Sequence, residues 1–186
     1  MKTSKKEIQD IFKAWIAISI AFAIVLRSSF DNIFLSFILS AITVGVGFLL
    51  HELSHKVMAQ RYGYMAEFRS FDSMLILAII FSFFGFVFAA PGAVMIPGNL
   101  NKKKNGIVSL AGPLTNLILA LLFLAISVIV TSGFLNLIGS YGYRINTWLA
   151  IFNMIPIWNF DGKKVFDWNK AVYFVFVVVA LIFLFF

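Results

Sequence analysis

Long apolar runs are the feature that most limits what this chain can fold into. A helix needs about 20 consecutive apolar residues to cross the hydrocarbon core of a bilayer. Five stretches approach that length, at about 11–27, 33–60, 107–132, 143–158 and 169–186. Hydrophobic residues make up 61% of the chain and charged residues 12%, whereas soluble domains are near half apolar and about a quarter charged. The sequence therefore predicts an all-α integral membrane protein.

A sixth apolar stretch, about 73–98, differs from the others in its glycines and prolines. It contains the segment FFGFVFAAPGAVMIPGN, in which these residues recur too often for one continuous helix. We therefore expect a re-entrant or hairpin segment here and five or six transmembrane helices in total. The polar gaps are too short for a soluble regulatory domain. We expect a single membrane-embedded domain over 1–186, with its core at about 33–164.

The distribution of positive charge indicates a membrane topology. The net charge is +7, and the basic residues fall in short gaps between apolar runs. This pattern favours contact with a lipid bilayer and argues against a nucleic-acid partner. If the N-terminus is cytoplasmic and 73–98 returns to the side it came from, every lysine and arginine except Arg27 and Arg144 is cytoplasmic. Because this satisfies the positive-inside rule, we expect a multi-pass protein of the cell membrane with a cytoplasmic N-terminus.

The only two histidines of the chain stand four residues apart near the end of one apolar run. His51, Glu52 and His55 form the pattern H-E-x-x-H. On a helix His51 and His55 share one face, so both imidazoles can bind one metal ion. Glu52 lies about 100° around such a helix, where its carboxylate can act on a water molecule. A buried histidine pair bonded to hydroxyls is the alternative, but ionisable residues inside a membrane span are costly and usually functional.

The third metal ligand has to be a carboxylate. A catalytic zinc site normally has three protein ligands, and the chain has no cysteine and no third histidine. Asp161 is the favoured candidate because Pro156 ends the preceding helix and Gly162 allows a close approach of the backbone. The predicted topology also brings His51, His55 and Asp161 to the cytoplasmic ends of their spans. The alternative for Asp161 is an ordinary surface turn.

The other acidic residues fit less well. Some precede the first span, lie at the far membrane face or stand further along the loop, namely Glu7, Asp10, Asp31 and Asp167. Glu67 and Asp72 follow the histidine motif closely, and the sequence leaves them open as ligands.

Three motifs in order carry a resemblance to a known family. HELSH followed by RYG, then SLAGPLTNLILA, then NMIPIWNFDG resemble the site-2 protease family of intramembrane zinc metalloproteases. The middle motif is similar to that family's A-G-P-x-x-N element at Gly112, Pro113 and Asn116. The last is similar to its N-x-x-P-x-x-x-x-D-G pattern, from Asn153 to Gly162. The bulky residues 158–160 replace a commoner proline-rich approach to the aspartate.

The resemblance implies one zinc ion held by His51, His55 and Asp161, with Glu52 as the catalytic base. It also implies membrane-protein substrates that are cut within or next to their transmembrane segments. The charge distribution then places the active site on the cytoplasmic side. The sequence does not predict an oligomeric state.

Two further roles are hypotheses. Asn153 is a candidate catalytic residue whose amide would donate to the oxyanion or to the substrate backbone, although a structural hydrogen bond between helices is equally compatible. Asn116 fits interhelical packing better than chemistry. The segment 73–98 could offer a strand edge to an unwound substrate, or act as a passive plug.

The main alternative function is a membrane metal-ion carrier or sensor that uses the same three ligands. Transport predicts further ligands along a path through the membrane, and the other spans offer almost none. Glu52 would also have no task in a carrier. An inactive scaffold is a second alternative, and the complete ligand set argues against it.

Overall fold

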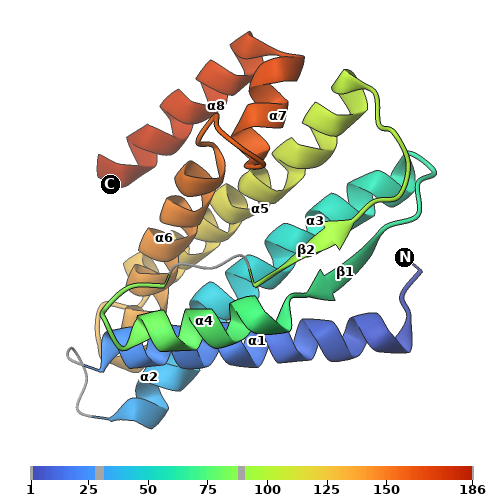
Figure 1. Ribbon diagram of the computed structural model, residues 1–186. Coiled ribbons are helices and arrows are strands. Elements are labelled where there is room, and N and C mark those ends of the chain that lie inside the picture. Colours follow the sequence, from blue (N-terminus) through green and yellow to red (C-terminus); the bar gives the residue numbers. More distant parts are fainter. Residues whose placement is uncertain (1, 28–31, 88–90, 186) are drawn as a thin grey trace.

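The computed structural model describes residues 2–27, 32–87 and 91–185 and is mostly helical (Figure 1). The elements follow the order α1 (Lys5–Leu26), α2 (Ile33–Ser40), the π-helical stretch η1 (Ala41–Gly45), α3 (Val46–Arg61), β1 (Glu67–Ser70), α4 (Asp72–Ser82), β2 (Gly92–Met95), α5 (Lys102–Ile129), α6 (Gly133–Asn153), α7 (Asp161–Trp168), α8 (Lys170–Ile182) and the terminal 3₁₀ turn η2 (Phe183–Phe185).

Three helices in these ranges are long and apolar enough to cross a membrane. They are α1, the continuous helix Ile33–Arg61 formed by α2, η1 and α3, and α5. The helix α6 has 21 residues but is interrupted by polar side chains, and α8 has only 13. The prediction of a helical membrane protein is therefore supported, whereas these criteria do not reach a count of five or six spans.

A two-stranded antiparallel sheet, called the β-hairpin below although the helix α4 lies between its strands in sequence, corrects the all-α prediction. The strands β1 and β2 pair antiparallel, with Glu67 opposite Met95 and Ser70 opposite Gly92. Just beyond the pair, the Phe71 backbone N–H donates to the Pro91 carbonyl. The chain therefore returns to the point where it left the hairpin, as the hairpin form of the 73–98 prediction requires. Its depth in a membrane stays a prediction.

The helix α4, which lies between the two strands in sequence, is too short to span a bilayer. Its 11 residues extend about 16 Å, against a hydrocarbon core of about 30 Å. Figure 1 shows α4 lying alongside α1, and β1 and β2 between α1 and α3. The predicted segment 73–98 is therefore a helix, a return and a strand rather than a span.

The helix α5 is the centre of the fold and packs against α3, α6 and α7. Small residues allow the closest approaches. An added Cβ at Gly142 of α6 would lie 2.4 Å from the Phe123 ring of α5, and one at Gly47 of α3 would lie 2.4 Å from Asn146 Oδ1. Helices in lipid associate through such small-residue contacts, because lipid provides no hydrophobic drive between them.

The stretch η1 interrupts the long helix that carries the histidines. In a π-helix the hydrogen bonds run from i to i+5, so the stretch holds one more residue than an α-helical path and frees backbone groups. The Val46 N–H bonds the Ala41 carbonyl, five residues back. The Trp15 indole N–H of α1 donates to the same carbonyl at 3.0 Å. This contact from a neighbouring helix stabilises the widened turn.

Two basic residues do not lie where the topology argument assumed. The helix expected at 143–158 extends from Gly133 to Asn153, so Arg144 is an exposed residue in its middle rather than at its outer end. Hydropathy did not reveal the first half of this helix, because that half contains polar residues. Lys56 is completely buried in an ion pair with Glu7. Neither residue supports the charge count, and the sidedness stays a prediction.

Candidate metal centre

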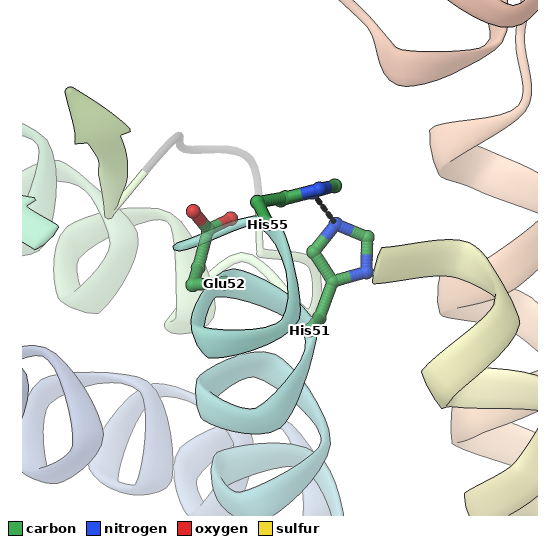
Figure 2. A group of neighbouring side chains, drawn as sticks. All are labelled: His51, Glu52 and His55. Atoms are coloured by element: carbon green, nitrogen blue, oxygen red, sulfur yellow. Dashed lines mark hydrogen bonds between the residues drawn. The ribbon is translucent and has the colours of Figure 1, made fainter. Parts of the chain in front are cut away.

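The two histidines of α3 point to one side of the helix and meet at their outer nitrogens. His51 Nε2 and His55 Nε2 are 3.0 Å apart, and both side chains are buried. Figure 2 shows the two imidazoles together and the Glu52 carboxylate on another side of the helix. This is the arrangement that the H-E-x-x-H spacing predicts.

Asp161 completes a triangle with the two histidines. Its Oδ2 lies 3.2 Å from His51 Nε2 and 3.1 Å from His55 Nε2. Asp161 is the first residue of α7, and the chain reverses between α6 and α7 to place it there. The reversal depends on Gly162, where an added Cβ would lie 2.2 Å from the Met154 carbonyl oxygen. The structure thus brings together the three residues that the sequence singled out as ligands.

The inner nitrogens of both imidazoles are held by acceptors. His55 Nδ1 lies 2.8 Å from the Val108 carbonyl of α5, which can only accept, so Nδ1 carries the proton. His51 Nδ1 lies 2.6 Å from Asn116 Oδ1. The Asn116 Nδ2 group donates to the Gly47 carbonyl, which fixes the amide with its oxygen toward His51. With the proton at Nδ1, the neutral imidazole presents a lone pair at Nε2.

With both imidazoles neutral, the triangle is made of three acceptors, and it fits a metal ion. Two nitrogen lone pairs and a carboxylate oxygen within 3.2 Å of one another repel unless a cation lies among them. Tetrahedral zinc with Zn–N bonds of 2.0–2.1 Å places neighbouring ligand atoms about 3.3 Å apart. Gly112 of α5 keeps the space free, since an added Cβ would lie 2.5 Å from His55 Nε2 and 2.6 Å from His51 Nε2.

Glu52 occupies a different position beside the triangle. Ligand-capable atoms of His51, Glu52 and His55 lie within 4.8 Å of one another, a group compatible with zinc. Asp161, however, is closer to both Nε2 atoms, and Glu52 Oε2 instead accepts a hydrogen bond of 3.2 Å from the Val94 backbone N–H of β2. Asp161 is therefore the carboxylate that completes the triangle, and Glu52 is a carboxylate that lies beside it.

The remaining described carboxylates lie in ion pairs and not at the triangle. Glu67 pairs with Arg69, and Asp72 pairs with Lys13 at 2.6 Å, so neither open alternative is brought to the site. Asp10, Glu7 and Asp167 also have lysine partners. Asp31 lies outside the described residues. Lys164 is a neighbour that the sequence did not point to, with its Nζ 3.6 Å from Asp161 Oδ1.

The asparagines are placed differently from the expectations. The Asn153 amide donates to the Leu149 carbonyl of its own helix at 2.9 Å, and the hydrogen bonds of the described residues do not join it to the triangle. Its catalytic role stays a prediction. Asn116, expected as a packing residue, contacts His51 as well as α3 and α6. The sequence analysis missed Asn146, a buried polar residue that accepts from Asn116.

The described residues thus form a mostly helical protein with three helices apolar and long enough to cross a membrane, and with a His51, Glu52 and His55 group compatible with zinc. No family model matches the chain, and no solved structure matches it. The chain is 44% identical over 174 residues to "Putative zinc metalloprotease MJ0611" of Methanocaldococcus jannaschii, a match that covers 91% of this chain and 88% of that protein. The chain belongs to the same family as this protein.

Proposed function

We propose that the protein is an intramembrane zinc metalloprotease similar to the site-2 proteases. It hydrolyses peptide bonds within or next to the transmembrane segments of membrane-protein substrates. The observation that carries the proposal is the triangle of His51 Nε2, His55 Nε2 and Asp161 Oδ2, with edges of 3.0–3.2 Å. A second carboxylate, that of Glu52, lies beside this triangle on the helix α3 that carries the two histidines. The kinship with a protein named as a zinc metalloprotease supports the same chemistry.

The residues of the site divide into ligands and a base. His51, His55 and Asp161 hold the zinc ion, which when bound supplies Lewis acidity and makes water a nucleophile near neutral pH. Glu52 takes the proton of the attacking water and returns it to the leaving amine. Its carboxylate lies within 4.8 Å of the histidine ligand atoms, a separation that accommodates a water molecule between them. Asn153 would help to stabilise the oxyanion only after leaving the Leu149 carbonyl.

The substrate has to lose helical structure before it can be cut. A helix in lipid has its carbonyls bonded within itself, so cleavage requires local unwinding. The β2 strand lies next to the site, since its Val94 N–H bonds Glu52, and the rest of its outer edge is a surface on which an extended peptide could add as a strand. The strand-edge role for 73–98 therefore fits the observed position of β2 better than a plug.

The cytoplasmic side is the proposed side of the site in the cell membrane. Lys102, Lys103 and Lys104 begin α5, and Lys104 lies over the rings of Tyr62 and Tyr64, at 5.6 and 5.1 Å from their centroids. A basic cluster with neighbouring tyrosines is typical of the cytoplasmic membrane interface.

The test is a Glu52→Gln variant in liposomes that contain a model transmembrane substrate. We expect cleavage to fall by about 10²–10⁴-fold with one zinc ion per chain retained. Glu67→Gln is the matched control, because Glu67 is a carboxylate paired with Arg69 away from the site, and it should cleave normally. Wild-type cleavage by Glu52→Gln would refute the proposal. Zinc flux that survives in this variant, without proteolysis in the wild type, would instead identify a carrier.

A further inference from the structure

A buried ion pair lies beside the site and has no place in the ligand set. Lys56 of α3 and Glu7 of α1 are both completely buried. Lys56 Nζ lies 2.7 Å from Glu7 Oε1 and 2.6 Å from Glu7 Oε2, and it also donates to Thr3 Oγ1 at 3.1 Å. All three ammonium donors are thus used. Burying two charges is costly, so the pair calls for an explanation.

The spacing along α3 places this pair next to Glu52. Glu52 and Lys56 are four residues apart, so they share one face of the helix, just as His51 and His55 share the adjacent face. The histidine face is turned to α5 and Asp161, because the Val108 carbonyl and Asp161 bond these imidazoles. The Glu52 and Lys56 face is turned to the β-hairpin and α1.

At one cross-strand pair of residues, called the rung below, a carboxylate accepts a hydrogen bond from each outer edge of the hairpin. Phe68 of β1 is paired with Val94 of β2. Glu7 Oε1 accepts from the Phe68 backbone N–H at 2.9 Å, and Glu52 Oε2 accepts from the Val94 backbone N–H at 3.2 Å. In an antiparallel pair that does not exchange hydrogen bonds, both N–H groups point outward. Glu7 and Glu52 therefore accept hydrogen bonds from opposite edges of the sheet at the same rung.

The rung is also fixed by packing. The Phe68 side chain is completely buried and contacts the Phe48 ring edge-on, with centroids 6.0 Å apart. A two-stranded hairpin is marginally stable by itself, and hydrogen bonds to ionised acceptors are stronger than neutral ones. The Glu7 carboxylate, which is paired with Lys56, is suited to anchor the hairpin from the side away from the site.

We propose that Glu7 and Lys56 are positioning residues that hold the β-hairpin and, through Phe68 and Val94, orient the Glu52 carboxylate for catalysis. This inference rests on the proposed function, because it assigns the pair a task in the action of Glu52. It extends the site to α1, which the ligand triangle does not touch.

The experiment compares two double variants that leave no lone buried charge. Glu7→Gln/Lys56→Met removes both charges but keeps an oxygen that can accept from the Phe68 N–H. Glu7→Leu/Lys56→Met removes both charges and that acceptor. We expect the leucine variant to lose about ten- to hundredfold in kcat with little change in KM and one zinc ion per chain. The glutamine variant should keep most of the wild-type kcat.

A spin label gives a readout independent of turnover. The chain has no cysteine, so Met95→Cys, at an exposed position of β2, accepts a single label. The label should become more mobile in the leucine variant and stay near the wild type in the glutamine variant. Equal kcat and equal label mobility in both variants would overturn the proposal. Parallel loss of zinc and of kcat in both would also overturn it, because a purely structural role predicts that result.

Amide hydrogen exchange on the wild-type protein decides the matter if either variant fails to fold. The Phe68 and Val94 amides should exchange slowly although they face outward from the sheet, and fast exchange of Phe68 would overturn the proposal. The two failures are distinguishable. A wild-type protein that cleaves no substrate refutes the proposed function, whereas label mobility and exchange still report whether Glu7 and Lys56 hold the hairpin.

Discussion

The substitution Gly112→Ala tests the metal centre with a single methyl group. The added Cβ would lie 2.5 Å from His55 Nε2 and 2.6 Å from His51 Nε2, in the space that zinc needs. An ordinary contact for that carbon is about 3.4 Å or more, so each imidazole must move back by close to 1 Å. A displacement of that size exceeds the tolerance of about 0.2 Å on a metal–ligand distance.

The expected loss is at least about 100-fold in zinc affinity, or about 2.7 kcal/mol. Changes to residues that only support the ligands already cost 10–100-fold, and here the ligand positions themselves are displaced. The helix should not weaken, because alanine is favoured over glycine inside a helix by about 1 kcal/mol. A fall in zinc content would therefore report the site and not the stability of α5.

The assay is zinc content by mass spectrometry on detergent-purified protein, after dialysis against a chelator of graded affinity. Gly142→Ala is the matched control, since its Cβ would lie 2.4 Å from the Phe123 ring in the α5–α6 interface and away from the histidines. It should keep its zinc. If Gly112→Ala binds zinc as tightly as the wild type, the imidazole nitrogens do not form the metal site.

Three other substitutions probe the ligands and the buried pair. Asp161→Asn should reduce zinc affinity by at least about 100-fold, and an unchanged zinc stoichiometry under chelator would remove Asp161 from the ligand set. Asn116→Leu should weaken zinc binding by about 10–100-fold, because it leaves His51 Nδ1 without its acceptor; the same titration measures it, and no change would show that the contact is unimportant. Glu7→Leu should destabilise the fold by about 3–5 kcal/mol, since it removes one partner of a buried ion pair. Thermal denaturation in detergent should show recovery in Glu7→Leu/Lys56→Met, and equal melting of the two would contradict this reasoning.

The meeting of the two histidines and Asp161 could be predicted, because the sequence features that position these residues are local. Helical spacing alone puts His51 and His55 on one face, and the proline and glycine around Asp161 indicate a turn that can bring a carboxylate close. The prediction that these residues meet required only that two helix ends lie at a similar depth. The observed edges of 3.0–3.2 Å agree with it.

The pairing of β1 with β2 and the buried ion pair were not predicted, because the residues that form each of them are distant in the sequence. Glu67–Ser70 reads as a polar gap, and Gly92–Met95 lacks the alternation that marks a half-buried strand. Lys56 was read as a topology signal because its partner Glu7 is 49 residues away. Pairings of this kind arise from tertiary packing, and no local pattern of apolar or charged residues specifies them.

The widened turn at η1 determines the direction in which the later side chains of the long helix point. Each residue of a helix advances the direction of its side chains by about 100°, and the π-helical stretch Ala41–Gly45 contains one residue beyond the regular count. Deleting a single residue there would leave a continuous helix with regular α-helical hydrogen bonds. The histidines would nevertheless swing by about a quarter turn, away from Asp161. An insertion or deletion within these five positions would therefore turn His51 and His55 away from Asp161 and break the triangle, although it would lie six or more residues before the first histidine.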